Sequence, residues 1–129
     1  LCDHSERKVI KEERLEKVII SAMKQSLKAY LPRLNPMIEF SRFVKNNQNS
    51  LKCIAHCDEG NKKSLQEIYT PGQNATILIG PEGDFSGNEI TLALANNFIP
   101  VTLGESRLRT ETAGIVACHS INFINEINH

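Results

Sequence analysis

Two short glycine-containing segments carry the residue types that could form a ligand site. The first is Ile77–Ser86, in which an apolar stretch runs into Gly80, Pro81, Glu82 and Gly83. Glycine lets the backbone approach a ligand closely, and proline stiffens a turn while removing one backbone donor. In open α/β sheets, ligands bind just beyond the carboxyl ends of the strands, where this turn is expected to lie. A plain tight turn between a strand and a helix explains the same residues, so both interpretations stay open.

The second segment is Val101–Gly104, followed by the polar stretch Glu105–Ala113. A strand is expected to end at the glycine, and a helix is expected to begin near Thr110, which can cap it. Glu111 suits the positive end of that helix, whereas Arg109 opposes the helix dipole. The position of Arg109 therefore indicates either that its side chain has a role other than stabilising the helix, or that it forms a salt bridge to a nearby carboxylate. Because both glycine turns are expected at strand ends of one sheet, a ligand pocket shared by the two turns is favoured over a site at either turn alone.

Neither segment is a phosphate-binding fingerprint. The chain contains no Gly-x-Gly-x-x-Gly and no Gly-x-x-x-x-Gly-Lys-Ser/Thr pattern, which are the signatures of dinucleotide and nucleoside triphosphate sites. Glu82 and Asp84 would also repel a phosphate group at the first turn. The sequence therefore does not support a cofactor that is held mainly by its phosphates.

The cysteines do not form a metal-binding pattern. They stand at Cys2, Cys53, Cys57 and Cys118, with His56 beside the middle pair. A zinc site would need a second ligand pair at metal spacing, and none follows. We therefore expect no metal, a reducing compartment, and cysteines that serve as small hydrophobic residues.

The apolar spacing predicts alternating helices and strands. The unbroken apolar run Ala75–Ile79 suits a strand covered on both faces, as in a parallel sheet. The Ser-x-x-Glu spacing at Ser86 and Glu89 is typical of a helix start. The order predicts an α/β fold with a mainly parallel sheet flanked by helices. The expected helices are 11–30, 86–97 and 110–127, and the expected strands are 51–56, 75–79 and 99–103, with a loop at 46–50 and a turn at 58–61.

Length and charge narrow the class of protein. The chain has 129 residues, 40% of them hydrophobic, which predicts one domain over residues 1–129. No apolar run approaches the roughly 18–20 residues that span a bilayer, so we expect no membrane partner. Zero net charge counts against a stand-alone nucleic-acid binder. Residues 1–33 nevertheless hold 8 basic and 5 acidic side chains, so a polyanion would prefer this third, although a solvated helix face explains the excess as well.

The last predicted helix is apolar on more than one stripe. A helix of this kind is buried on more than one side, either within the monomer or against a partner. A chain of this size has few ways to cover such a helix alone, so we expect a homodimer. The apolar positions are Ala113, Ile115, Val116, Ala117, Cys118, Ile121, Phe123, Ile124 and Ile127.

The two glycine segments together closely resemble those of the SPOUT methyltransferases. The residues that carry this resemblance are Ile79–Gly83, Leu103–Gly104 and Leu108–Ala113. They match best the ribosomal RNA small subunit methyltransferase E family, which methylates N3 of a uridine in 16S ribosomal RNA. The resemblance extends to Ser5-Glu6-Arg7 and Gln25-Ser26, and it covers nearly the whole chain in the right order.

The resemblance implies a fold, an oligomeric state, an RNA substrate, a cellular compartment and a cofactor. The sheet would end in a deep C-terminal trefoil knot, and the enzyme would act as a homodimer on 16S ribosomal RNA in a bacterial cytoplasm. The cofactor would be S-adenosylmethionine, and no metal would be needed. Arg109 and Arg7 would hold phosphate or the uracil carbonyls as catalytic residues. The cofactor would be bound by Ile79, Gly80, Pro81, Glu82, Gly83, Thr102, Leu103, Gly104, Leu108, Arg109, Thr110, Glu111, Thr112 and Ala113.

The chain departs from the family at several places. Asp84 stands where a second glycine is common, and Leu27-Lys28 stand where Gly-Arg is common. The family's first strand and helix of the methyltransferase domain, and a PUA-like RNA-binding domain ahead of them, have no counterpart in the 129 residues. We therefore expect a chain that binds the cofactor and that need not methylate alone.

Two other classes of function remain as alternatives. One is a non-catalytic SPOUT-like module for dimerisation and RNA docking, which would bind S-adenosylmethionine poorly. The other is a different nucleotide-binding α/β enzyme, such as a flavodoxin-like domain. The absence of a glycine fingerprint argues against this second alternative.

Overall fold

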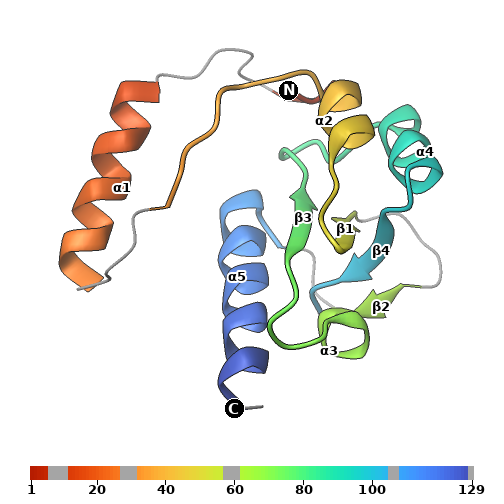
Figure 1. Ribbon diagram of the computed structural model, residues 1–129. Coiled ribbons are helices and arrows are strands. Elements are labelled where there is room, and N and C mark those ends of the chain that lie inside the picture. Colours follow the sequence, from red (N-terminus) through yellow and green to blue (C-terminus); the bar gives the residue numbers. More distant parts are fainter. Residues whose placement is uncertain (6–11, 27–31, 57–61, 105–107, 128–129) are drawn as a thin grey trace.

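The protein folds around a small parallel sheet flanked by helices (Figure 1). The computed structural model describes residues 1–5, 12–26, 32–56, 62–104 and 108–127. Within these residues, no helix is long and apolar enough to cross a membrane. The elements are α1 (Glu12–Ser26), α2 (Phe40–Asn46), β1 (Leu51–Ala55), β2 (Lys63–Ser64), α3 (Leu65–Ile68), β3 (Ala75–Ile79), α4 (Gly87–Ala95), β4 (Ile99–Thr102) and α5 (Thr110–Ile127).

The strands lie in the order β2-β4-β1-β3, and every pairing between them is parallel. Ala55, the last residue of β1, is opposite Ile79 of β3 and Val101 of β4. The carboxyl ends of these three strands therefore meet at one edge of the sheet. The predicted α/β fold with a parallel sheet is confirmed.

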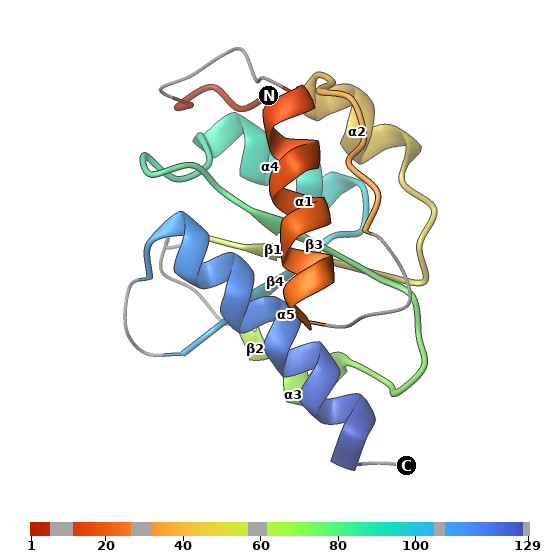
Figure 2. The same ribbon diagram turned by 90° about the vertical axis from the view of Figure 1, so that its left-hand side faces the viewer.

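Two apolar layers cover the sheet. On one face, Phe40 and Val44 of α2 pack with Phe85 and with Ile90 of α4. On the other face, residues from α3 and α5 pack against β1 and β4, with Leu65 and Ala117 among them. Helix α1 stands apart from the sheet on the side of α5, as the two views show together (Figures 1 and 2).

The central strand β1 supplies the most deeply buried side chains. Cys53 and Ile54 have no exposed surface. Burial raises the pKa of the Cys53 thiol to about 11, because a thiolate would lose its hydration. This thiol stays protonated and acts as a small apolar side chain. Cys2, Cys53 and Cys118 are free thiols, and Cys57 lies outside the described residues.

Several predicted boundaries are confirmed. Strand β3 and helix α5 have the expected bounds. Helix α4 begins at a capping box, in which the Ser86 hydroxyl accepts from the amide of Glu89 at 3.2 Å. The strands predicted to reach His56 and Leu103 each end one residue earlier. Of the helix predicted over 11–30, the structure has Glu12–Ser26; residues 11 and 27–31, and the turn predicted at 58–61, lie outside the described residues.

Strand β3 has apolar layers on both faces, as predicted: Leu78 packs against the layer of α2 and α4, and Ala75, Ile77 and Ile79 pack against the layer of α3 and α5. Strand β3 is the last strand of the described sheet, and all five of its residues are only half-buried. An apolar run marks a strand, but it does not fix the strand's place in the sheet. Helix α2 was not among the predicted helices, and β2 and α3 are too short to show a period.

Candidate functional site

The turn after β3 is held in shape by hydrogen bonds from its own backbone. The amide of Asp84 donates to the carbonyl of Pro81 at 2.8 Å. Asp84 has a φ of 63°, in the left-handed region that aspartate tolerates better than most residues. Its Oδ1 accepts from the amide of Phe85 at 2.8 Å. The buried ring of Phe85 then anchors the turn in the core, 5.6 Å from the ring of Phe40.

The turn after β4 is shaped by Thr102 and Gly104. The Thr102 hydroxyl donates to the carbonyl of Gly104 at 2.8 Å and accepts from its amide at 3.2 Å. Gly104 has a φ of 135°, which side chains disfavour. Among the described residues, a Cβ at this position would meet no atom within 4 Å. The glycine backbone is therefore open to a ligand, and the conformation rather than crowding demands glycine.

Thr110 joins the turn after β3 to the start of α5. Its hydroxyl donates to the carbonyl of Gly80 at 2.8 Å, across 30 residues of sequence. This bond ties the start of α5 to the carboxyl end of β3, so Thr110 does more than begin a helix. The helix itself starts with the amide of Ala113 donating to the carbonyl of Arg109 at 2.8 Å. The bond thus links the first of the two predicted segments to the second.

The predicted cofactor residues come together at this edge of the sheet. Ile79–Gly83 follow β3, Thr102–Gly104 end and follow β4, and Leu108–Ala113 enter α5. Ala113 is buried, whereas the side chains of Arg109, Glu111 and Thr112 are exposed. The described residues include no ion-pair partner for Arg109. The other predicted catalytic residue, Arg7, lies outside the described residues.

Two histidines at this edge were not predicted. His4 Nδ1 lies 2.9 Å from the carbonyl oxygen of Gly83, a contact between residues 79 positions apart that no sequence pattern announces. His56 directly follows β1, and its Nδ1 is buried. Because β1 ends at the same edge of the sheet, the position of His56 directly after this strand could have predicted that the residue lies there.

The arrangement fits a ligand that is recognised by backbone groups. Two glycine-containing turns and the start of a helix follow the strand ends at this edge, and Gly104 presents open backbone. Among the described residues, no group of three His, Cys, Asp or Glu side chains is placed to hold a metal ion. An adenosine moiety suits this edge because its polar atoms can pair with backbone amides and carbonyls.

A family model for an RNA methyltransferase domain matches residues 1–122. The chain belongs to this family. The resemblance to the ribosomal RNA small subunit methyltransferase E family is confirmed by relatives such as that of Synechocystis sp., which is 33% identical over 121 residues. That alignment covers 90% of this chain and 40% of the relative, so the chain spans less than half the length of this relative.

Solved structures of this methyltransferase class have the same fold. A probable rRNA-methyltransferase from Porphyromonas gingivalis is 46% identical, with a TM-score of 0.93, and the match covers 100% of this chain and 56% of that one. A ribosomal RNA small subunit methyltransferase E from Neisseria gonorrhoeae, bound to S-adenosyl methionine, is 28% identical with a TM-score of 0.78. That match covers 92% of this chain and 52% of the other.

Proposed function

We propose that this chain is the cofactor-binding part of a methyltransferase that uses S-adenosylmethionine to methylate N3 of a uridine in 16S ribosomal RNA. The observation that carries the proposal is the hydrogen bond from Thr110 to the Gly80 carbonyl, which joins the start of α5 to the turn after β3. Support comes from the fold shared with the N. gonorrhoeae enzyme, whose structure holds S-adenosyl methionine. The bacterial relatives favour the cytoplasm as the site of action, because ribosomal RNA is the substrate that their names imply.

In this proposal the backbone at Ile79–Gly83, Thr102–Gly104 and Leu108–Ala113 holds the cofactor. When bound, S-adenosylmethionine supplies a methyl group that is already activated by its sulfonium sulfur. The protein's work is then to orient the uridine N3 and to exclude water. Arg109, exposed at the start of α5, holds a phosphate or a uracil carbonyl through its guanidinium. Arg7 takes a similar part as the second catalytic arginine.

A second copy of the chain is proposed to cover one stripe of α5. The helix buries Ala113 and Ala117 against the sheet. Ile115, Phe123 and Ile127 remain exposed at 70%, 44% and 59%. These three and His119 are spaced four residues apart, so they line one face of the helix. The His119 and Phe123 rings stack with centroids 6.0 Å apart, so this stripe offers a continuous surface for a homodimer.

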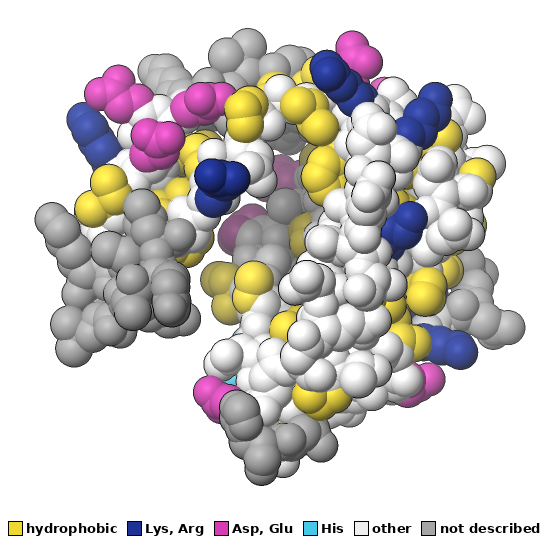
Figure 3. All heavy atoms as spheres, viewed as in Figure 1, with side chains coloured by type: hydrophobic (Ala, Val, Ile, Leu, Met, Phe, Trp, Pro, Cys, Tyr) yellow, Lys and Arg dark blue, Asp and Glu magenta, His cyan; other side chains and the backbone are white. Residues whose placement is uncertain are grey.

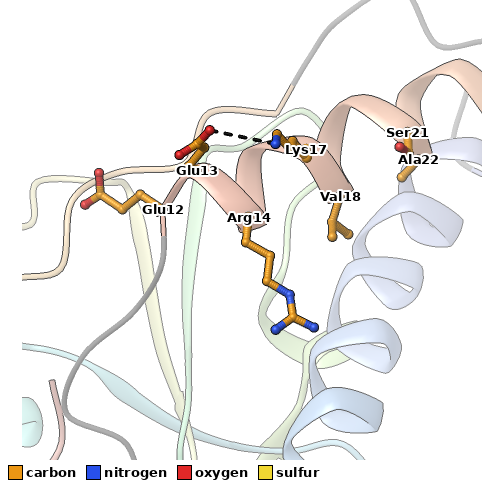
Figure 4. Close-up of a pocket in the computed structure, with 7 residues that line it drawn as sticks. All are labelled: Glu12, Glu13, Arg14, Lys17, Val18, Ser21 and Ala22. Carbon is orange, nitrogen blue, oxygen red and sulfur yellow. Dashed lines mark ion pairs between the residues drawn. The ribbon is translucent and has the colours of Figure 1, made fainter.

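The domain is proposed to include a further strand and helix, with a PUA-like RNA-binding domain beyond them. Among the described residues, strand β3 has a neighbouring strand on one side only, and all five of its residues are half-buried. The surface is hollowed between α1 and α5 (Figure 3). A cavity of about 770 Å³ is lined on α1 by Arg14 and Val18, among others. Both side chains point to the side of α1 on which α5 lies (Figure 4), where the added elements would pack. The trefoil knot stays a prediction.

Cofactor binding tests the proposed function directly. We expect the purified chain to bind S-adenosylmethionine in the micromolar range by isothermal titration calorimetry. Gly104→Val is expected to weaken binding at least about tenfold, because a β-branched residue is strained at this φ. Gly72→Val is the matched control, since Gly72 also has a positive φ, of 82°, and open space around it, but lies away from the site.

The arginine variant separates binding from turnover. Arg109→Ala is expected to keep cofactor affinity within about threefold, whereas methyl transfer to RNA by a chain that carries the further domain falls at least about tenfold. A folded chain without measurable affinity for the cofactor would contradict the proposed function and favour the non-catalytic module.

The dimer is tested by charge on the α5 stripe. Phe123→Lys is expected to raise the dimer dissociation constant about 100-fold in sedimentation velocity, because it buries an unpaired charge. Leu94→Lys on α4 is the control, since Leu94 has the same exposed fraction of 44%. Equal effects of the two substitutions, or a wild-type monomer, would contradict the proposed interface.

The free edge of β3 is tested by amide hydrogen exchange. The amides of Ala75–Ile79 that point away from β1 are expected to exchange at least about tenfold faster than those bonded within the sheet. Fusing to this chain the residues of the P. gingivalis relative that lie outside the matched region should slow the exchange of these amides. Unchanged exchange in a folded fusion would argue that no strand pairs there.

A further inference from the structure

The segment Leu1–Ser5 lies against the turn that follows β3, although His4 and Gly83 are 79 positions apart in the sequence. His4 Nδ1 is 2.9 Å from the carbonyl oxygen of Gly83. A carbonyl oxygen only accepts, so the Nδ1 atom must carry the proton and donate. A Cβ on Gly83 would lie 2.9 Å from the His4 Cβ. The backbone of the turn therefore packs directly on His4, and any side chain at position 83 would push the two segments apart.

A second anchor holds the same segment one residue earlier. The Asp3 amide donates to Oε2 of Glu89 at 3.1 Å, and the Ser86 hydroxyl donates to Oδ2 of Asp3 at 2.7 Å. Glu89 is only 5% exposed, and its Oε1 accepts from the Ser86 amide at 2.9 Å. Asp3 thus completes the hydrogen bonding of a buried carboxylate, whose loss would be costly. This anchor fixes the segment on α4 and so fixes where His4 can reach.

The turn between β3 and α4 is consequently held at two points besides its own bonds. Thr110 donates to the carbonyl of Gly80 at one end, and His4 donates to the carbonyl of Gly83 at the other. The first bond comes from α5 and the second from the N-terminal segment. Both are made to the backbone groups that the proposed function assigns to the cofactor.

We propose that His4 is a positioning residue for the cofactor site, which holds the Gly83 carbonyl and with it the turn Gly80–Asp84 in the conformation that binds S-adenosylmethionine. The proposal rests on the proposed function of this turn. It also links two parts of the chain, because whatever displaces the segment Leu1–Ser5 would loosen the cofactor turn.

The test compares two substitutions of His4 by calorimetry with S-adenosylmethionine. His4→Leu keeps a side chain of similar bulk without a donor, and it is expected to weaken binding about tenfold. His4→Asn places an amide N–H near the position of Nδ1, so it should restore affinity to within about twofold of wild type. A role in packing alone would not distinguish the two variants in this way. Wild-type affinity in His4→Leu, or equal losses in both variants, would overturn the proposal.

A second measurement does not depend on the cofactor. In alkaline buffer, in which imidazole rings are neutral, a long-range ¹H–¹⁵N spectrum reports which ring nitrogen carries the proton. We expect His4 in the Nδ1–H form. The Nε2–H form would overturn the proposal even if the protein binds S-adenosylmethionine. The Nδ1–H form in a protein that fails to bind it would contradict the proposed function and leave the His4 contact established.

Discussion

The hydrogen bond from Thr110 to the Gly80 carbonyl, 2.8 Å long, connects the two halves of the candidate site. Without it, the turn after β3 and the entry to α5 would be separate loops at one edge of a sheet. The bond forms because the parallel register brings the carboxyl ends of β1, β3 and β4 together. The other features of the candidate site, such as the open backbone at Gly104 and the exposed Arg109, lie at this same edge of the sheet.

Helix α5 has two distinct faces, and each one constrains the protein differently. The small residues Ala113 and Ala117 let the helix lie close to the sheet, which keeps Thr110 within reach of Gly80. The opposite stripe, with Ile115 at 70% exposure, is apolar enough to seek a partner. A homodimer built on this stripe would bring a second copy near the site without altering the inner face.

Local sequence signals predicted the elements that position the site. The capping box at Ser86 and Glu89, the apolar run at Ala75–Ile79 and the long apolar helix from Thr110 are strong and short-range. The glycines at the strand ends marked the site itself. The resemblance on Leu108–Ala113 then added the cofactor, which spacing alone does not give.

Long-range contacts could not be predicted in the same way. That β3 is the last strand of the described sheet depends on which strands pair with it, and its apolar run carries no such information. The contact of His4 with Gly83 joins residues 79 positions apart, so no periodicity encodes it. The short elements β2 and α3 are fixed by packing, although the Ser64-x-x-Glu67 capping box was a visible signal.

The central claim is that both turns and the start of α5 form one cofactor site. The most direct measurement is a titration of ¹⁵N-labelled protein with S-adenosylmethionine, followed by amide chemical shifts. The account predicts that amides in Gly80–Asp84, Thr102–Gly104 and the first turn of α5 shift together, with one dissociation constant. Shifts confined to one turn, shifts centred on α1, or no shifts in a folded chain would contradict it.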